Sequence, residues 1–114
     1  SLLVSHFVQD AGARTDYFRS IAERLKPGAP LFNADLCADP SGPDFQSLMS
    51  FWQGMMAKAG MTPEGREQYA RSFGTLFACH GPADVEAMIE AAGFIPPVHC
   101  VQAGLIKGWL TAKA

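Results

Sequence analysis

Apolar positions in the first third of the chain change from helical to strand-like spacing. Residues 15–25 carry an apolar stripe with charged residues between its members, which predicts an amphipathic helix. Thr15 is its expected cap, and Pro27-Gly28 ends it. The apolar run of residues 31–34, ending at Asp35, predicts a buried strand. This helix followed by a strand is the repeating unit of an α/β sheet.

The rest of the chain completes that pattern. Apolar residues at positions 2–4, 7 and 8 predict a first buried strand, so residues 1–36 form a parallel strand–helix–strand crossover. Helical spacing predicts three further helices, over residues 44–59, 62–77 and 81–93. Residues 94–101 and 105–111 are linked so closely that only an antiparallel hairpin fits, and Pro96-Pro97 assigns the first of them to a sheet edge. An alternating strand–helix pattern needs one helix after the second strand, but two are predicted, over residues 44–59 and 62–77. We therefore expect these two helices to be an insertion.

Composition narrows the class of protein. A chain of 114 residues that is 48% hydrophobic and 18% charged fits one globular domain, residues 1–114. Its net charge of −2 gives no reason to expect nucleic acid or an anionic membrane as partner. No apolar run is long enough to cross a bilayer, and the N-terminus lacks the basic start of a signal peptide. We therefore expect a cytoplasmic protein.

The cysteines do not predict a metal site. Cys37, Cys79 and Cys100 are widely separated, and no Cys-x-x-Cys pair occurs. The adjacent pairs Cys79-His80 and His99-Cys100 suggest a four-ligand site, but neighbours on a strand point to opposite faces. We expect free thiols and no metal.

The order of elements resembles the C-terminal half of class I S-adenosylmethionine-dependent methyltransferases. The segments that carry this resemblance span nearly the whole chain: residues 3–7 (LVSHF), 18–28 (FRSIAERLKPG), 90–94 (EAAGF) and 108–110 (GWL). In that family the LKPG turn precedes the fifth strand and the AGF the sixth. The resemblance implies an α/β fold with a partial Rossmann-like sheet of four strands in the order 4-5-7-6, with an antiparallel C-terminal hairpin and two inserted helices.

The chain departs from the family where the cofactor is held. The family cradles S-adenosylmethionine with a glycine-rich loop in its N-terminal half, and this sequence has no Gly-x-Gly. Ligands of open α/β sheets bind where the strand order reverses, and here only one wall of that crevice would exist. The first strand would also have a bare edge, and such edges recruit another chain. We therefore expect a homodimer formed through residues 1–8.

The resemblance and the pattern together indicate candidate site residues. Ser5, His6 and Phe7, just past the first strand, match the family's position beside the methionine part of the cofactor; His6 is also a candidate base. The alternative is a strand-to-loop transition in which the histidine caps a backbone group. Asp35 is a candidate substrate-orienting carboxylate or, equally, the cap of the loop at Ala38.

The first inserted helix supplies the remaining candidates. Phe51, Trp52 and Met55, with Met56, are expected to line an apolar substrate pocket, although an aromatic and methionine stripe is more often plain core. No catalytic residue is assigned.

Three functions follow from these expectations. The first is the C-terminal part of a methyltransferase acting on a small molecule, with S-adenosylmethionine as the cofactor of the complete enzyme, and inactive as this fragment. The second is a non-catalytic α/β module that dimerises through its open edge. The third is an enzyme whose partner chain supplies the glycine-rich half.

Overall fold

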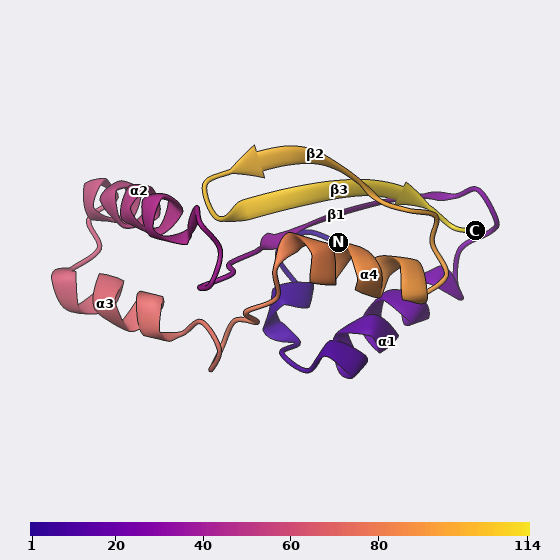
Figure 1. The fold of residues 1–114 in the computed structure, drawn as a ribbon, viewed down its shortest axis with the longest axis horizontal. Coiled ribbons are helices and arrows are strands. Elements are labelled where there is room, and N and C mark those ends of the chain that lie inside the picture. The colour runs from indigo at the N-terminus through magenta and orange to yellow at the C-terminus, as the bar shows by residue number, and fades with distance from the viewer.

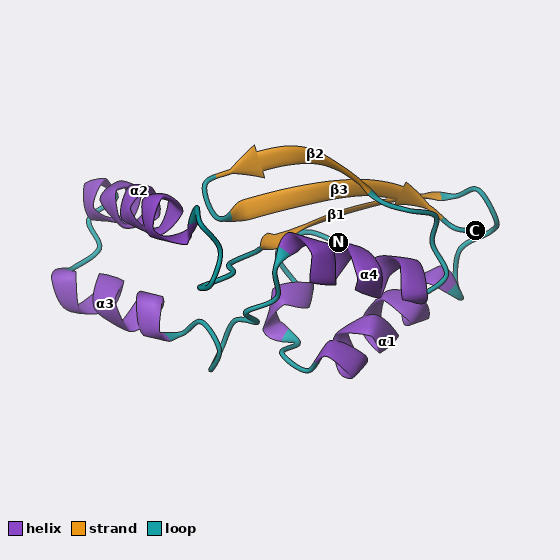
Figure 2. Ribbon diagram, in the orientation of Figure 1, coloured by secondary structure: helices purple, strands orange, loops and turns teal.

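Three strands form one antiparallel sheet in the order β1-β3-β2 (Figures 1 and 2). The computed structural model describes all of residues 1–114. Its strands are β1 (Pro30–Leu36), β2 (Val98–Ala103) and β3 (Ile106–Ala112). Its helices are the short 3₁₀ helix η1 (Ser5–Phe7), α1 (Ala11–Ala22), α2 (Phe45–Lys58), α3 (Pro63–Arg71) and α4 (Pro82–Ala91). The protein is therefore α/β, as expected.

The C-terminal hairpin forms as the sequence predicts. β2 and β3 pair antiparallel, with Val98 opposite Leu110 and Ala103 opposite Ile106. The turn between them contains Gly104 with a φ of 58°, a left-handed conformation that glycine adopts without steric cost. β2 starts after Pro96-Pro97 and lies at the edge of the sheet, because prolines cannot donate to a strand ladder.

One face of the sheet carries the larger core. Helices α1 and α4 lie side by side against this face (Figure 1). The core beneath them joins residues of both helices to inward-facing residues of β1 and β3, among them Phe18, Leu31, Val85, Ile89 and Trp109. Alternation along β1 turns Leu31, Asn33 and Asp35 toward the helices, so two polar side chains enter this buried layer.

Helix α1 starts four residues earlier than the sequence pattern indicates. Asp10, not Thr15, caps it: the Asp10 carboxylate accepts the Ala13 N–H at 2.8 Å. Thr15 lies inside the helix and donates its hydroxyl to the Ala11 carbonyl at 2.8 Å. Either side chain can cap a helix, and the cap that forms is Asp10, at the end of the segment that follows η1.

The predicted first strand is wrong. Leu2 makes only a single parallel bridge, to Ala34, and Leu3 adopts a φ of 57°, which ends any extended run. The chain then turns into η1. The four-strand order 4-5-7-6 is consequently not present. The sheet has three strands, and the segment expected as strand 4 contributes one bridge beside β1.

The reason for this difference lies in what residues 1–6 contact. The Ser1 carbonyl and the Leu3 N–H bond the Ala34 N–H and carbonyl at 2.9 and 2.7 Å. Beyond Leu3 the backbone turns inward, so that Ser5 and His6 are buried while Leu2 to Val4 are exposed. Ser5 and His6, both polar, are therefore buried where the hydrophobic pattern predicted that apolar residues would be buried.

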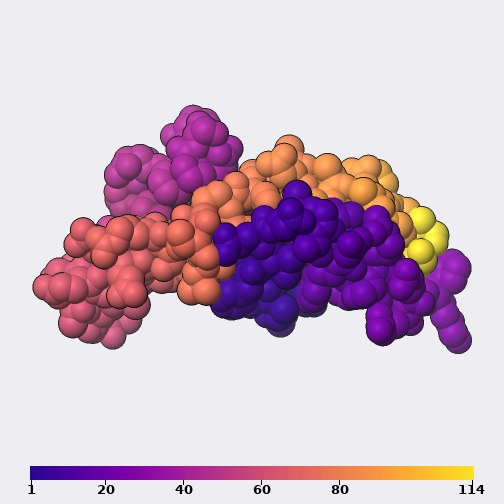
Figure 3. Space-filling view, turned by 90° about the horizontal axis from the view of Figure 1, so that it is seen from below, coloured from indigo at the N-terminus to yellow at the C-terminus, as the bar shows by residue number.

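Helices α2 and α3 project from one end of the sheet and give the molecule its elongated shape, 47 × 25 × 24 Å (Figure 3). A second, smaller core holds them there, with Leu36, Ala38, Met49, Phe77 and Leu105 at its centre. Thr62 caps α3 and Pro63 begins it, as the sequence predicts. These helices are the expected insertion. No helix of the structure is long and apolar enough to cross a membrane.

Candidate functional site

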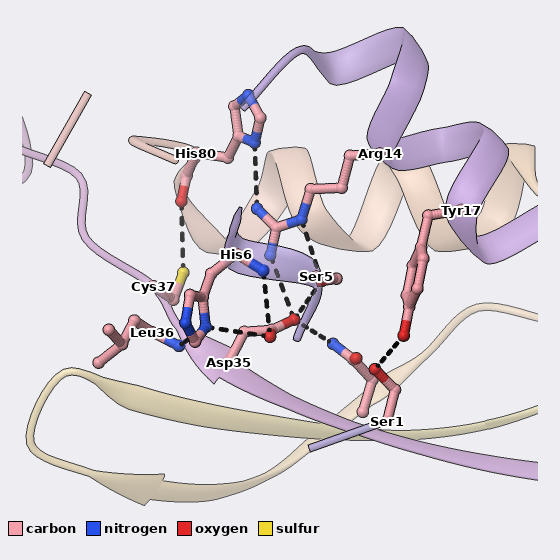
Figure 4. Close-up of polar contacts among 10 residues, drawn as sticks. Ser1, Ser5, His6, Arg14, Tyr17, Asp35, Leu36, Cys37 and His80 are labelled. Carbon is pink, nitrogen blue, oxygen red and sulfur yellow. Dashed lines mark hydrogen bonds and ion pairs between the residues drawn. The ribbon is translucent and has the colours of Figure 1, made fainter. Parts of the chain in front are cut away.

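A buried carboxylate near the end of β1 is the centre of the polar interior. Asp35 has no exposed surface, and its oxygens are contacted by donors from three elements (Figure 4). Asn33 Nδ2 donates to Oδ2 at 2.8 Å, Arg14 Nη2 donates to it at 3.2 Å, and the Ser5 hydroxyl donates to it as well. The His6 backbone N–H donates to Oδ1 at 3.2 Å. Burial of a carboxylate requires such compensation.

Arg14 joins this carboxylate to the rest of the molecule. Its Nε donates to Ser5 Oγ and its Nη1 to His80 Nδ1, each at 3.1 Å. The guanidinium is buried, and that burial lowers the pKa of Arg14 while Asp35 opposes the shift. Arg14 therefore links α1, the segment before α4, η1 and β1 through one side chain.

His6 occupies the boundary between this polar network and an apolar pocket. Its Nδ1 accepts the backbone N–H of Leu36 at 3.1 Å and also lies 3.2 Å from Asp35 Oδ1. One nitrogen cannot accept the amide hydrogen and donate to the carboxylate together. The amide always carries its hydrogen, and burial lowers the pKa of His6, so Nδ1 is the acceptor of a neutral imidazole.

The other ring nitrogen of His6 then carries the hydrogen. Nε2 has no hydrogen-bond partner in the chain, and Figure 4 shows it turned away from Asp35. The residue is only 2% exposed, and the one fully buried side-chain nitrogen or oxygen without a hydrogen-bond partner is Asn33 Oδ1. His6 Nε2 is therefore open to the adjoining pocket rather than sealed in the interior.

The pocket that His6 lines has a volume of about 310 Å³. The rings of Phe7 and Phe77 flank the imidazole, with centroids 4.5 and 5.5 Å from it. Trp52 of α2 and Tyr69 of α3 form the opposite side, where Trp52 Nε1 donates to the Tyr69 hydroxyl at 3.1 Å. Apart from His6, no acidic or basic side chain lines the pocket.

Trp52 and Tyr69 also separate this pocket from a second one. The second pocket, about 320 Å³, lies between α2 and α3 and is lined by Met55, Met56 and Ala59 with the same two rings. Both pockets open to solvent and both are apolar. The inserted helices therefore form an apolar surface that continues from His6 to the end of the molecule.

The structure brings some predicted site residues together and leaves others apart. Ser5 and His6 adjoin Asp35, and Phe7 and Trp52 share the pocket with His6. Met55 lines only the second pocket and a shallow hollow that it shares with Phe51, and neither residue reaches His6.

Of the two roles predicted for Asp35, its contacts exclude the capping of the loop at Ala38. Its carboxylate bonds residues 5, 6, 14 and 33 rather than the loop at Ala38. Direct contact with a substrate would require η1 to move away, because the carboxylate is fully buried.

Sequence reasoning missed Arg14, Asn33, Tyr69 and Phe77 as contributors. A signal existed for two of them. Arg14 lies on the apolar stripe of α1, four residues before Phe18, and Asn33 is a polar residue inside an apolar strand. Polar residues at core positions indicate a buried network. Tyr69 and Phe77 become site residues only through the packing of α3.

The residues present do not form a complete site for S-adenosylmethionine. The polar groups of Ser5 and Asp35 are buried and bonded to each other and to Arg14, so they are not free to hold a ligand. Phe7, about half exposed, is the predicted cofactor residue that faces outward. This chain therefore supplies one wall at most, and no reaction step can be assigned to it.

Comparison with known proteins indicates the fold. No family model and no curated protein matches the chain. Among solved structures, a possible exported protein from Bordetella parapertussis superimposes with a TM-score of 0.66 at 21% identity, over 99% of this chain and 37% of that one. The S-adenosylmethionine-dependent methyltransferase SibL in its apo form superimposes with a TM-score of 0.61 at 15% identity, over 98% of this chain and 30% of that one. This chain spans about a third of the length of each, and it has a methyltransferase-like α/β fold.

Proposed function

We propose that this chain is the C-terminal part of an S-adenosylmethionine-dependent methyltransferase that acts on a small molecule, and that it is inactive alone. The observation that carries the proposal is the superposition on SibL over 98% of this chain but 30% of that protein. The order of β1, β3 and β2, with the reversed hairpin strand in the middle, agrees with the last three strands that the resemblance implied.

The N-terminal segment is where a missing half would join. Ser1 to Leu3 run parallel to β1, and the peptide groups of Leu2 have no partner in the chain. A further parallel strand in register with Leu2 would extend the sheet in the direction in which a cofactor-binding half is expected. Cytoplasmic location stays a prediction of the sequence.

Two titrations test the proposal. Calorimetry of this chain with S-adenosylmethionine should show no binding at micromolar concentrations, since one wall makes few contacts. A longer polypeptide, extended upstream in the natural reading frame, should bind it at micromolar concentrations. Micromolar binding by the chain alone contradicts its inactivity as a fragment. Failure of the longer polypeptide to bind contradicts the methyltransferase assignment, unless addition of a separate chain with a glycine-rich loop restores binding.

A second candidate function is a non-catalytic module that forms a homodimer through residues 1–8. It is favoured by one observation: Leu2, Leu3, Val4 and Phe7 are between 45% and 65% exposed and lie beside the unpaired edge of Leu2. An open apolar edge recruits another strand. The test is the state of association, described in the Discussion.

A further inference from the structure

We propose that the pocket between η1 and helices α2 and α3 binds an uncharged, mostly apolar ring compound whose oxygen acceptor receives the His6 Nε2 hydrogen. That this ligand is the methyl acceptor rests on the proposed function. The binding itself rests on the geometry of this chain.

The first step of the argument is the state of His6. The Leu36 N–H points at Nδ1 from 3.1 Å and is buried, so it would lose its only partner if Nδ1 carried a hydrogen. Asp35 Oδ1 does not need a hydrogen from His6 Nδ1, because it already accepts the His6 backbone N–H. The imidazole is therefore neutral with its hydrogen on Nε2, and in this state it donates to a ligand and cannot remove a proton from one.

The second step is the direction of that hydrogen. His6 lines the pocket, only 2% of the residue is exposed, and no hydrogen bond within the chain uses Nε2, which is open to the pocket. Tyr69 lines the same pocket and supplies a second donor. The Tyr69 oxygen accepts from Trp52, which leaves its own hydrogen free, and burial raises the pKa of this phenol so that it keeps that hydrogen. Both polar groups of the pocket are thus donors.

The third step is the chemistry of the lining. Beyond these donors the walls are the rings of Phe7, Trp52 and Phe77 and the side chains of Leu3, Leu36 and Ile106. A charged ligand would find no opposite charge there, whereas an apolar ring gains from burial and aromatic contact. A volume of about 310 Å³ is at the small end of ligand pockets, which suits a compound of one or two rings.

The experiment compares two ligands that differ in one acceptor. 1-Tetralone carries a carbonyl where tetralin has a methylene group. Each is titrated into the intact chain, and binding is followed by the NMR shifts of the Leu36 and Phe77 amides. The ratio of the two affinities should fall about three- to tenfold in His6→Asn, the range of one net hydrogen bond. Asn places an oxygen where Nδ1 was, so the Leu36 N–H keeps an acceptor while the Nε2 donor is lost.

Further variants define the site. Trp52→Ala should weaken both ligands alike, because it removes a wall and no donor. Phe51→Ala, next to Trp52 but outside this pocket, should change neither affinity.

Two results would overturn the proposal. One is an affinity ratio that is the same in His6→Asn as in the unaltered chain. The other is ¹⁵N NMR of the His6 ring showing the hydrogen on Nδ1. Neither measurement uses S-adenosylmethionine. The ligand-binding proposal can therefore hold if the methyltransferase proposal fails, and it can fail if the methyltransferase proposal holds.

Discussion

Among single-residue substitutions, those at Asp35 and Arg14 should lower the free energy of unfolding most. Their charged groups lie 3.2 Å apart and both side chains are buried. Asp35→Asn leaves the guanidinium without its counter-charge, so we expect a loss of about 3 kcal/mol or more in unfolding free energy, measured by urea denaturation. Glu67→Gln, which breaks the exposed pair with Arg71 on α3, should change it by about 0.5 kcal/mol or less. Equal losses in the two variants would contradict a structural role for the buried pair.

Two histidines, the buried His6 and the partly exposed His80, predict a pH dependence of stability. Burial lowers the pKa of His6 and of His80, with Arg14 adding to both shifts. The unfolded chain therefore binds protons first as pH falls, so stability is greatest above the ordinary histidine pKa of about 6.5 and decreases below it. His6→Asn should flatten the decrease between about pH 7 and 5. Urea midpoints at several pH values measure this, and an unchanged slope in His6→Asn counts against it.

At the scale of elements, the β2–β3 turn and α2 depend on each other. A Cβ on Gly104 would lie 2.5 Å from Cε3 of Trp52, so the turn and the helix meet without room for a methyl group. Gly104→Ala should therefore destabilise the protein by about 1–3 kcal/mol more than the backbone strain alone. Gly28→Ala measures that strain, since Gly28 also has positive φ but open space around it. Thermal unfolding of both variants checks this, and equal shifts would show that α2 does not pack as described.

Element boundaries show what the local pattern can predict. β1, α2, α4 and the hairpin lie close to their predicted ranges, because each combines a clear period with proline, glycine or capping signals. α3 begins where the sequence predicts but ends at Arg71, six residues before the predicted end at residue 77. The start of α1 differs from its predicted position, since Asp10 and Thr15 are both capable caps. The choice depends on how η1 and the residues after it lead into the helix, which no local signal encodes.

At the scale of the whole molecule, residues 1–8 are the predicted contact between two copies of the chain. If the proposed homodimer forms there, sedimentation equilibrium should show a dimer at micromolar concentrations, because pairing of two open edges buries exposed leucines and satisfies the Leu2 peptide groups. Leu2→Glu should shift the equilibrium toward the monomer by about tenfold or more, since a carboxylate would be buried at the contact.

A matched substitution far from this edge separates the effect from a general change in solubility. Met61→Glu places the same charge on an exposed apolar residue between α2 and α3 and should leave association unchanged. A chain that is monomeric at all concentrations removes the homodimer, and a dimer weakened equally by both substitutions places the contact elsewhere.

Part of the candidate site could be predicted from the sequence. Of the candidates that the sequence gave, His6 and Trp52 line one pocket, and Ser5 bonds Asp35 beside His6. The burial of Ser5 and His6 was not predictable, because it depends on Arg14 and Asn33 meeting Asp35 from α1 and β1. Such contacts join residues up to 30 positions apart, as between Ser5 and Asp35.

The sequence by itself determined the presence of four helices, β1, the C-terminal hairpin, the edge position of β2 and the α/β class, since periodicity and the backbone limits of proline and glycine act within a few residues. Only the tertiary structure decided that the chain turns inward at Leu3, that Asp35 is satisfied internally, and that His6 presents a hydrogen to an apolar pocket. Those outcomes depend on burying charge and hydrogen-bonding groups among elements distant in sequence, and a buried polar group is stable only where all its partners arrive together.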